Sequence, residues 1–172
     1  QKFIAWLVEN SPNFIRAASG WQGFGDWLAA AETPKALLGT ACYAHSVDLM
    51  ARIADVLGKS DDAVQYRKLF ENIRAAFIER FVLPDGVILN NTQTAYALAL
   101  QFDLLPPDLR PRAAERLAKN VRENGNKLTT GFVGTPHLLF ALSENGHLET
   151  AFDLLLQTDC PSWLYPVTQG AT

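Results

Sequence analysis

Hydrophobic residues recur at the spacing of amphipathic helices along most of the chain. Between residues 34 and 57, apolar side chains repeat at helical intervals until the pattern ends at Gly58. Thr33 is the predicted N-cap, and Pro34 occupies the first turn, where its missing N–H costs nothing. The pattern therefore predicts a long helix over residues 34–57.

Charge-poor and charge-rich helical patterns then alternate, about six in all. Each charge-poor stretch is followed by one that carries charged residues around a single apolar stripe. This alternation predicts helical hairpins in which one helix is interior and its partner is on the surface. The charge-poor helices are predicted at residues 34–57, 92–102 and 135–146, and the charge-rich ones at 61–81, where Asp61 is the predicted cap, 111–124 and 148–155.

Each charge-poor helix begins at or just after a short polar segment, and the first and third of these segments also carry glycine and an aromatic residue. We call these segments, residues 23–27, 90–94 and 129–135, the rim segments. If the charge-poor helices line the inside of a ring, the rim segments lie together on one edge of it. Such an edge suits a small polar ligand.

Strand signals are weak, since residues 86–89 and 127–130 form at most short extended pieces. No Pro/Ser-rich linker or low-complexity stretch divides the chain. The predicted fold class is therefore all-α, in a single domain over residues 1–172.

Composition and charge narrow the class of function. The 172 residues are 48% hydrophobic and 19% charged, with a formal net charge of -3, as in a soluble globular domain. Mild acidity and the lack of a Lys/Arg stripe argue against nucleic-acid binding. Apolar runs fall short of the roughly 20 residues of a membrane helix, so no membrane segment is expected. The composition does not distinguish a cytoplasmic protein from a secreted one.

Cysteine and histidine give no sign of a metal or cofactor site. Cys42 and Cys160 match neither a metal spacing nor a disulfide framework, and we interpret both as buried small apolar side chains. His45, His137 and His147 do not share metal-ligand spacing. No metal and no other cofactor is expected.

An ordered set of short motifs runs from about Trp21 to Thr172, each of them weakly specific alone. They are GDWL at 25–28, TPKAL at 33–37, TQTAYAL at 92–98, TGFVGTP at 130–136, PSWLY at 161–165 and QGAT at 169–172. The set resembles the catalytic domain of bacterial α-L-rhamnosidases, inverting glycoside hydrolases that release terminal rhamnose. The resemblance implies a six-hairpin α/α toroid, of which this chain supplies about half, and a rhamnose-containing glycoside as substrate.

The resemblance also implies where the catalytic carboxylates lie. In that family the general acid precedes the GDW motif in a carboxylate-rich segment, which has no counterpart here, and the general base follows the QGAT motif, where this chain stops. Inverting hydrolysis needs two carboxyl groups roughly 6.5 to 9.5 Å apart, and the rim segments offer only Asp26. We expect both catalytic carboxylates to lie outside the chain, which is then an internal piece of a larger enzyme, inactive alone. Helices such as 92–102 are expected to expose apolar surface where the remaining hairpins dock.

Four residues are candidate substrate-binding residues: Asp26, Trp27, Gln93 and Trp163. The resemblance implies that Trp27 stacks on the sugar, and the alternative is a core aromatic that fixes its loop. Asp26 either accepts hydrogen bonds from sugar hydroxyls or caps nearby backbone N–H groups. Gln93 either faces the cavity or satisfies a helix terminus. Trp163 lies in a proline-flanked loop, as a rim contact or a packing residue.

A second hypothesis is a non-catalytic helical-hairpin module that binds carbohydrate or protein. It explains the helices and the lack of paired carboxylates. It does not explain why tryptophan, glutamine, threonine and glycine concentrate where the charge-poor helices begin.

Overall fold

The computed structural model describes residues 1–16 and 23–171, and within these ranges all regular secondary structure is helical. Outside the helices, a single isolated antiparallel bridge joins Val82 and Ile88 in the described part. The predicted all-α class is confirmed. Trp21 and Thr172, which belong to the motif set, lie outside the described residues. The elements are α1 (Lys2–Glu9), the 3-10 turn η1 (Pro12–Phe14), α2 (Lys35–Val56), α3 (Ser60–Phe81), α4 (Gln93–Gln101), α5 (Arg110–Glu123), α6 (Thr135–Ser143), α7 (Leu148–Leu155) and α8 (Tyr165–Thr168).

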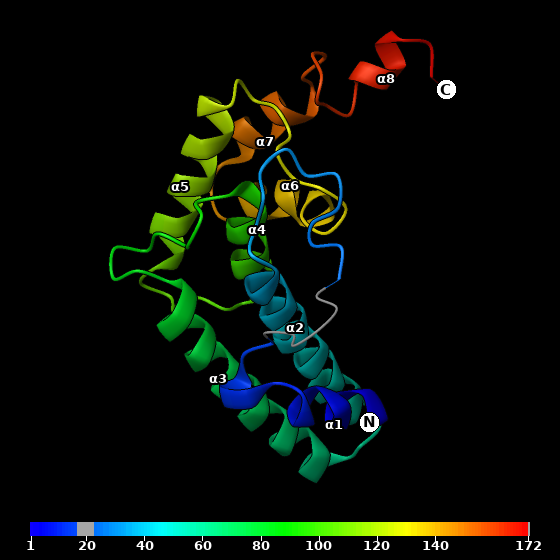
Figure 1. Cartoon of the computed structure of the whole chain (residues 1–172), viewed down its shortest axis with the longest axis vertical. Coiled ribbons are helices and arrows are strands. Elements are labelled where there is room, and N and C mark those ends of the chain that lie inside the picture. The colour runs from blue at the N-terminus through cyan, green and yellow to red at the C-terminus, as the bar shows by residue number, and fades with distance from the viewer. Residues whose placement is uncertain (17–22, 172) are drawn as a thin grey trace.

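Three helical hairpins follow one another along the chain: α2–α3, α4–α5 and α6–α7 (Figure 1). The two helices of each hairpin pack against each other, and α4 also packs against both α2 and α6. The charge-poor helices α2, α4 and α6 are therefore consecutive neighbours, as the charge alternation predicted. Between α2 and α3, Gly58 has a φ of 68°, a left-handed conformation that glycine adopts without strain.

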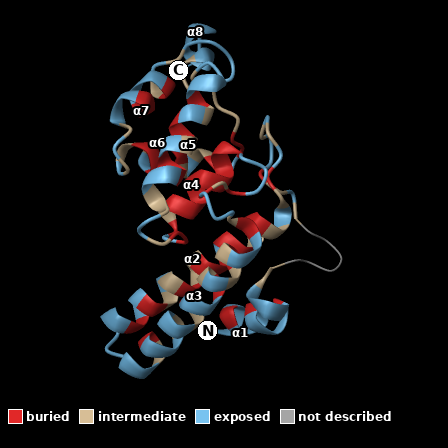
Figure 2. Ribbon diagram, turned by 90° about the vertical axis from the view of Figure 1, so that its left-hand side faces the viewer, coloured by how far each residue is buried: buried red, intermediate tan, exposed pale blue. Residues whose placement is uncertain are grey.

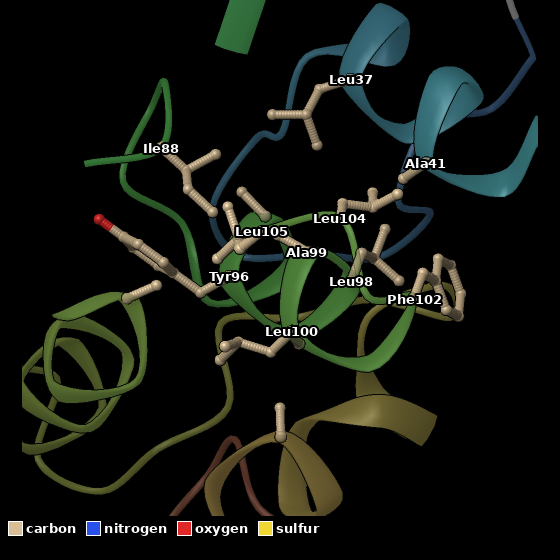
Figure 3. Packing of buried hydrophobic residues seen from close by; sticks show 14 of the residues in the cluster. Leu37, Ala41, Ile88, Tyr96, Leu98, Ala99, Leu100, Phe102, Leu104 and Leu105 are labelled. Carbon is tan, nitrogen blue, oxygen red and sulfur yellow. The ribbon is translucent and has the colours of Figure 1, made fainter. Parts of the chain in front are cut away.

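Helix α4 is the most deeply buried element of the described chain (Figure 2). Every residue of it from Gln93 to Leu100 is buried. Its alanines let the neighbouring helices approach closely, while its leucines fill the space between them. Around it, the side chains of Leu37, Ala41, Ile88 and Leu104 complete the packing (Figure 3).

The predicted exposed apolar surface lies elsewhere than expected. Helix α4, predicted to be exposed, is enclosed by α2, α5 and α6, so that detail of the prediction is wrong. Exposed apolar side chains instead include Phe140 on α6, and Leu148 and Phe152 on α7. These three residues help to line an open groove of about 780 Å³ between the two helices. No helix in the described ranges is long and apolar enough to cross a membrane.

Two predicted helix caps are wrong. Helix α2 begins at Lys35, and the hydroxyl of Thr33 pairs with that of Thr92 at 2.6 Å instead of capping the helix. Asp61 lies inside the first turn of α3, where its charge suits the helix dipole, but it makes no cap hydrogen bond. The side chain of Thr92 caps α4 by accepting the Ala95 N–H at 3.2 Å.

The predicted burial of the cysteines is also wrong, since both residues are exposed, although partial burial of the Cys42 sulfur still raises the pKa of its thiol. Cys42 falls on the helical stripe of α2 that also carries Leu49 and Ile53, and those two residues are exposed as well. Cys160 follows α7, in the segment that leads to α8. Cys42 thus lies on an apolar stripe of α2 that faces away from the core.

Candidate functional site

The three rim segments meet at the carboxylate of Asp26. Its Oδ2 accepts the Thr94 hydroxyl at 2.5 Å and the Gly131 N–H at 2.8 Å. Its Oδ1 accepts the N–H groups of Val133 at 2.7 Å and Gly134 at 3.2 Å. One side chain therefore joins the starts of α2, α4 and α6, and the predicted common rim is confirmed. In Figure 1 the blue segment before α2 and the yellow segment before α6 lie side by side.

Backbone hydrogen bonds join the first and third rim segments and the residues next to them. The Phe132 N–H donates to the Trp27 carbonyl at 3.0 Å, and the Ala31 N–H donates to the Thr129 carbonyl at 3.2 Å. Gly131 lies so close to the first segment that a Cβ there would come within 2.2 Å of the Trp27 oxygen. The two segments can approach in this way only because residue 131 has no side chain.

Aromatic side chains project from this junction. Trp27 is 55% exposed and Phe132 is 66% exposed, and their rings stack with centroids 5.3 Å apart and planes at 25°. Phe24 also lies near Trp27, with ring centroids 6.3 Å apart and planes tilted by 41°. The indole of Trp27 is thus accessible at the rim, outside the hydrophobic core. We call Trp27 and Phe132 the aromatic pair.

Gln93 lies behind this surface and is fully buried. Its Nε2 donates to the Lys127 carbonyl at 3.1 Å, and its Oε1 accepts the Thr129 N–H at 3.0 Å. Both ends of the amide therefore hold the extended stretch that leads into the third rim segment. Asp26 is 8% exposed and is also saturated by protein donors.

Trp163 is half-buried and packs against the hydrophobic core. It lines the groove between α6 and α7 together with Phe132. The structure thus brings three of the four candidates to the junction, Asp26, Trp27 and Gln93, and sets Trp163 on the groove beside it. Phe132 was not among the candidates, although its position between Gly131 and Gly134 in the motif TGFVG could have identified it as exposed.

Two histidines flank a buried phenylalanine, Phe102, at the carboxyl end of α4. The imidazole of His45 stacks on Phe102 with centroids 4.1 Å apart, and His137 meets the same ring edge-on at 4.8 Å. Burial lowers the pKa of His45, an effect that Asp48 opposes and Arg52 reinforces. Burial also lowers the pKa of His137, and the nearby His45 lowers it further.

The described residues contain no cluster of three or more His, Cys, Asp or Glu side chains that could hold a metal ion. The rim segments hold Asp26 as their one carboxylate. What the junction offers chemically is an exposed aromatic surface on a rigid polar frame, which suits binding of a ligand with an apolar face.

Comparison with known proteins agrees with this architecture. The sequence model described as the bacterial alpha-L-rhamnosidase 6 hairpin glycosidase domain matches residues 1–172. The chain is 44% identical over 171 residues to an alpha-L-rhamnosidase of Streptomyces avermitilis, covering 99% of this chain and 16% of that protein. It is 37% identical over 182 residues to one of Formosa agariphila, covering 100% of this chain and 19% of that protein. The chain thus spans less than a fifth of the length of these relatives.

Solved structures give the same result. The crystal structure of the Streptomyces avermitilis alpha-L-rhamnosidase complexed with L-rhamnose matches with a TM-score of 0.92 at 44% identity, over 98% of this chain and 16% of that one. The alpha-L-rhamnosidase of Aspergillus terreus matches with a TM-score of 0.81 at 35% identity, over 85% of this chain and 18% of that one. The chain therefore belongs to the six-hairpin glycosidase family of the bacterial α-L-rhamnosidases.

Proposed function

We propose that this chain forms part of a larger α-L-rhamnosidase, which releases terminal α-L-rhamnose from rhamnosides, and that it supplies part of the sugar-binding rim. The observation that carries the proposal is the exposed indole of Trp27, held at the junction of three segments. Rhamnose is a 6-deoxy sugar with an apolar face and a methyl group. An indole face buries such a surface while leaving the sugar hydroxyls free for polar groups.

The other residues at the junction have roles that differ from that of Trp27. The remaining hairpins of the enzyme supply the acid and the base, because the one rim carboxylate, Asp26, is already saturated by four protein donors. Gln93 sets the third rim segment through its two backbone hydrogen bonds. Trp163 borders the substrate region from the groove side. The reaction proceeds with inversion, with the acid protonating the leaving oxygen while the base activates water on the opposite face.

Substitution of Trp27 tests the proposal in the intact polypeptide that contains this chain. Trp27→Ala removes stacking area but no carboxylate, so kcat/KM for an aryl α-L-rhamnoside should fall by roughly 5- to 150-fold, equivalent to about 1 to 3 kcal/mol. Trp6→Ala is the matched control, because Trp6 is 46% exposed and stacks on Phe3 in α1, away from the rim. It should leave kcat/KM within about 2-fold of the unsubstituted protein.

Proton NMR of the first product separates the stereochemical claim from the binding claim. Inversion predicts that β-L-rhamnose appears before mutarotation, and initial α-L-rhamnose would contradict it. A lack of rhamnoside hydrolysis, or equal losses for Trp27→Ala and Trp6→Ala, would contradict the proposed function itself.

A further inference from the structure

The carboxylate of Asp26 has no free acceptor position for a ligand. A carboxylate offers about four lone-pair sites, and here Thr94, Gly131, Val133 and Gly134 each donate one hydrogen bond to it. The residue is 8% exposed, so water and sugar hydroxyls have little access to it. A buried, fully bonded carboxylate of this kind orders the groups around it.

The groups that Asp26 orders carry the aromatic pair. Trp27 follows Asp26 directly in the chain, and Phe132 lies between two of the residues that donate to the carboxylate, Gly131 and Val133. A further hydrogen bond runs from the Phe132 N–H to the Trp27 carbonyl at 3.0 Å. Each aromatic residue is therefore next in the chain either to Asp26 itself or to a residue whose N–H group is bound by the Asp26 carboxylate.

The position of Asp26 also suits its charge. The carboxylate lies at the amino end of α6, which begins at Thr135, and accepts the N–H groups of the two residues just before it. A negative charge is favourable there, because the helix dipole places partial positive charge at that end. Hydrogen bonds to a charged acceptor are also stronger than neutral ones.

We infer that Asp26 is a positioning residue for the sugar site: its carboxylate sets the spacing and tilt of the aromatic pair and does not contact the substrate. Phe132 is, on the same grounds, a second aromatic surface of the site, because it shares the frame and stacks on Trp27 at 5.3 Å. The assignment rests on the proposed function for its link to rhamnosides. The geometric part of the inference is that Asp26 controls the aromatic pair, and this part can be tested independently of the proposed function.

Two substitutions perturb the carboxylate with little change of shape. Asp26→Asn replaces one oxygen by an amide nitrogen, which faces N–H and O–H donors and leaves at least one of them without an acceptor. Thr94→Val removes one donated hydrogen bond and keeps the side-chain outline. Asp103→Asn is the matched control: Asp103 is on the surface, pairs with Arg110, and has a φ of 55°, which asparagine tolerates.

A double-mutant cycle with Trp27→Ala measures whether Asp26 acts through the tryptophan. In the intact polypeptide, Asp26→Asn should lower kcat/KM, per folded molecule, by about 10-fold or more when Trp27 is present, and by less than about 3-fold in the Trp27→Ala background. Thr94→Val should show the same dependence with a smaller loss, and Asp103→Asn should change neither background. Equal losses in both backgrounds would mean direct contact with the substrate and would overturn the inference. So would unchanged activity per folded molecule.

Quenching of Trp27 fluorescence by acrylamide supplies a readout that needs no activity. The Trp27 contribution is the difference between proteins with and without Trp27→Ala, measured with and without Asp26→Asn. A raised quenching constant in the Asp26→Asn protein supports the positioning role, and an unchanged constant overturns it. If Trp27→Ala leaves rhamnoside hydrolysis unchanged while the quenching constant still rises, the sugar contact of the proposed function fails and the control of the aromatic pair by Asp26 stands.

Discussion

Gly131→Ala perturbs the junction of the rim segments at its narrowest point. A Cβ at residue 131 would meet the Trp27 oxygen at 2.2 Å, the Asp26 carbonyl oxygen at 2.6 Å and the Ala29 nitrogen at 2.8 Å. All three are backbone atoms, which have no rotamer that would relieve the contact. The two segments must therefore separate.

The size of the effect follows from the hydrogen bonds that separation breaks. One is the Gly131 N–H to the Asp26 carboxylate at 2.8 Å, and the other is the Phe132 N–H to the Trp27 carbonyl at 3.0 Å. A hydrogen bond to a charged group contributes about 1.5–3 kcal/mol and a neutral one about 0.5–1.5 kcal/mol. Gly131→Ala should therefore lower the free energy of unfolding by about 2–4.5 kcal/mol.

Urea unfolding of the chain, followed by circular dichroism, measures this difference. Gly146→Ala is the control, because a Cβ at Gly146 has no neighbour within 4 Å and its φ is 88°. Its cost is only that of a left-handed alanine, about 1–2 kcal/mol. In the intact polypeptide, Gly131→Ala should also lower kcat/KM for rhamnosides, whereas Gly146→Ala should not. If Gly131→Ala were no more destabilising than Gly146→Ala, the close approach of the two segments would be refuted.

Three further predictions concern other parts of the chain. Burial holds the pKa of both His45 and His137 below the ordinary value of 6.5, so their contribution to stability is present above pH 6.5 and is lost as the pH falls below it. His137→Phe should therefore reduce the loss of unfolding free energy between about pH 7 and pH 5. An unchanged dependence of the unfolding free energy on pH would contradict this prediction. The apolar groove between α6 and α7 should drive self-association of the isolated chain, so Phe140→Asp should lower the apparent mass measured by light scattering. If the unsubstituted chain is a monomer at all concentrations, the prediction is refuted. Both cysteine residues are exposed, so maleimide should label Cys42 and Cys160 in the native protein, with Cys42 the slower because burial raises the pKa of its thiol. Labelling of only one would show that the other is covered.

The alternation of charge along the chain was sufficient to predict the hairpins, because it reflects which helices contact other helices and which contact water. It also placed the starts of α2, α4 and α6 on one rim, since alternate helices of consecutive hairpins run in the same direction. Which face of an individual helix is buried was less predictable. Cys42 belongs to an apolar stripe of α2 whose exposure depends on how the neighbouring helices are arranged.

Contacts between residues far apart in the chain were not predictable from local patterns. Thr33 looked like a helix cap, but its hydroxyl pairs with Thr92, 59 residues away. Asp26 receives hydrogen bonds from residues 68 to 108 positions further along. The alternative of capping nearby backbone N–H groups anticipated backbone donors to Asp26, but three of its donors are the distant N–H groups of Gly131, Val133 and Gly134, which only the fold brings to it.

The central claim is that the exposed indole of Trp27 forms one wall of a rhamnose site. A crystal structure of the intact polypeptide with bound L-rhamnose tests it most directly. The prediction is a sugar ring in van der Waals contact with the Trp27 indole, with Phe132 beside it and the Asp26 carboxylate still held by Thr94 and Gly131 and out of contact with the sugar. Rhamnose bound elsewhere, or an indole of Trp27 covered by another part of the polypeptide, would contradict the claim.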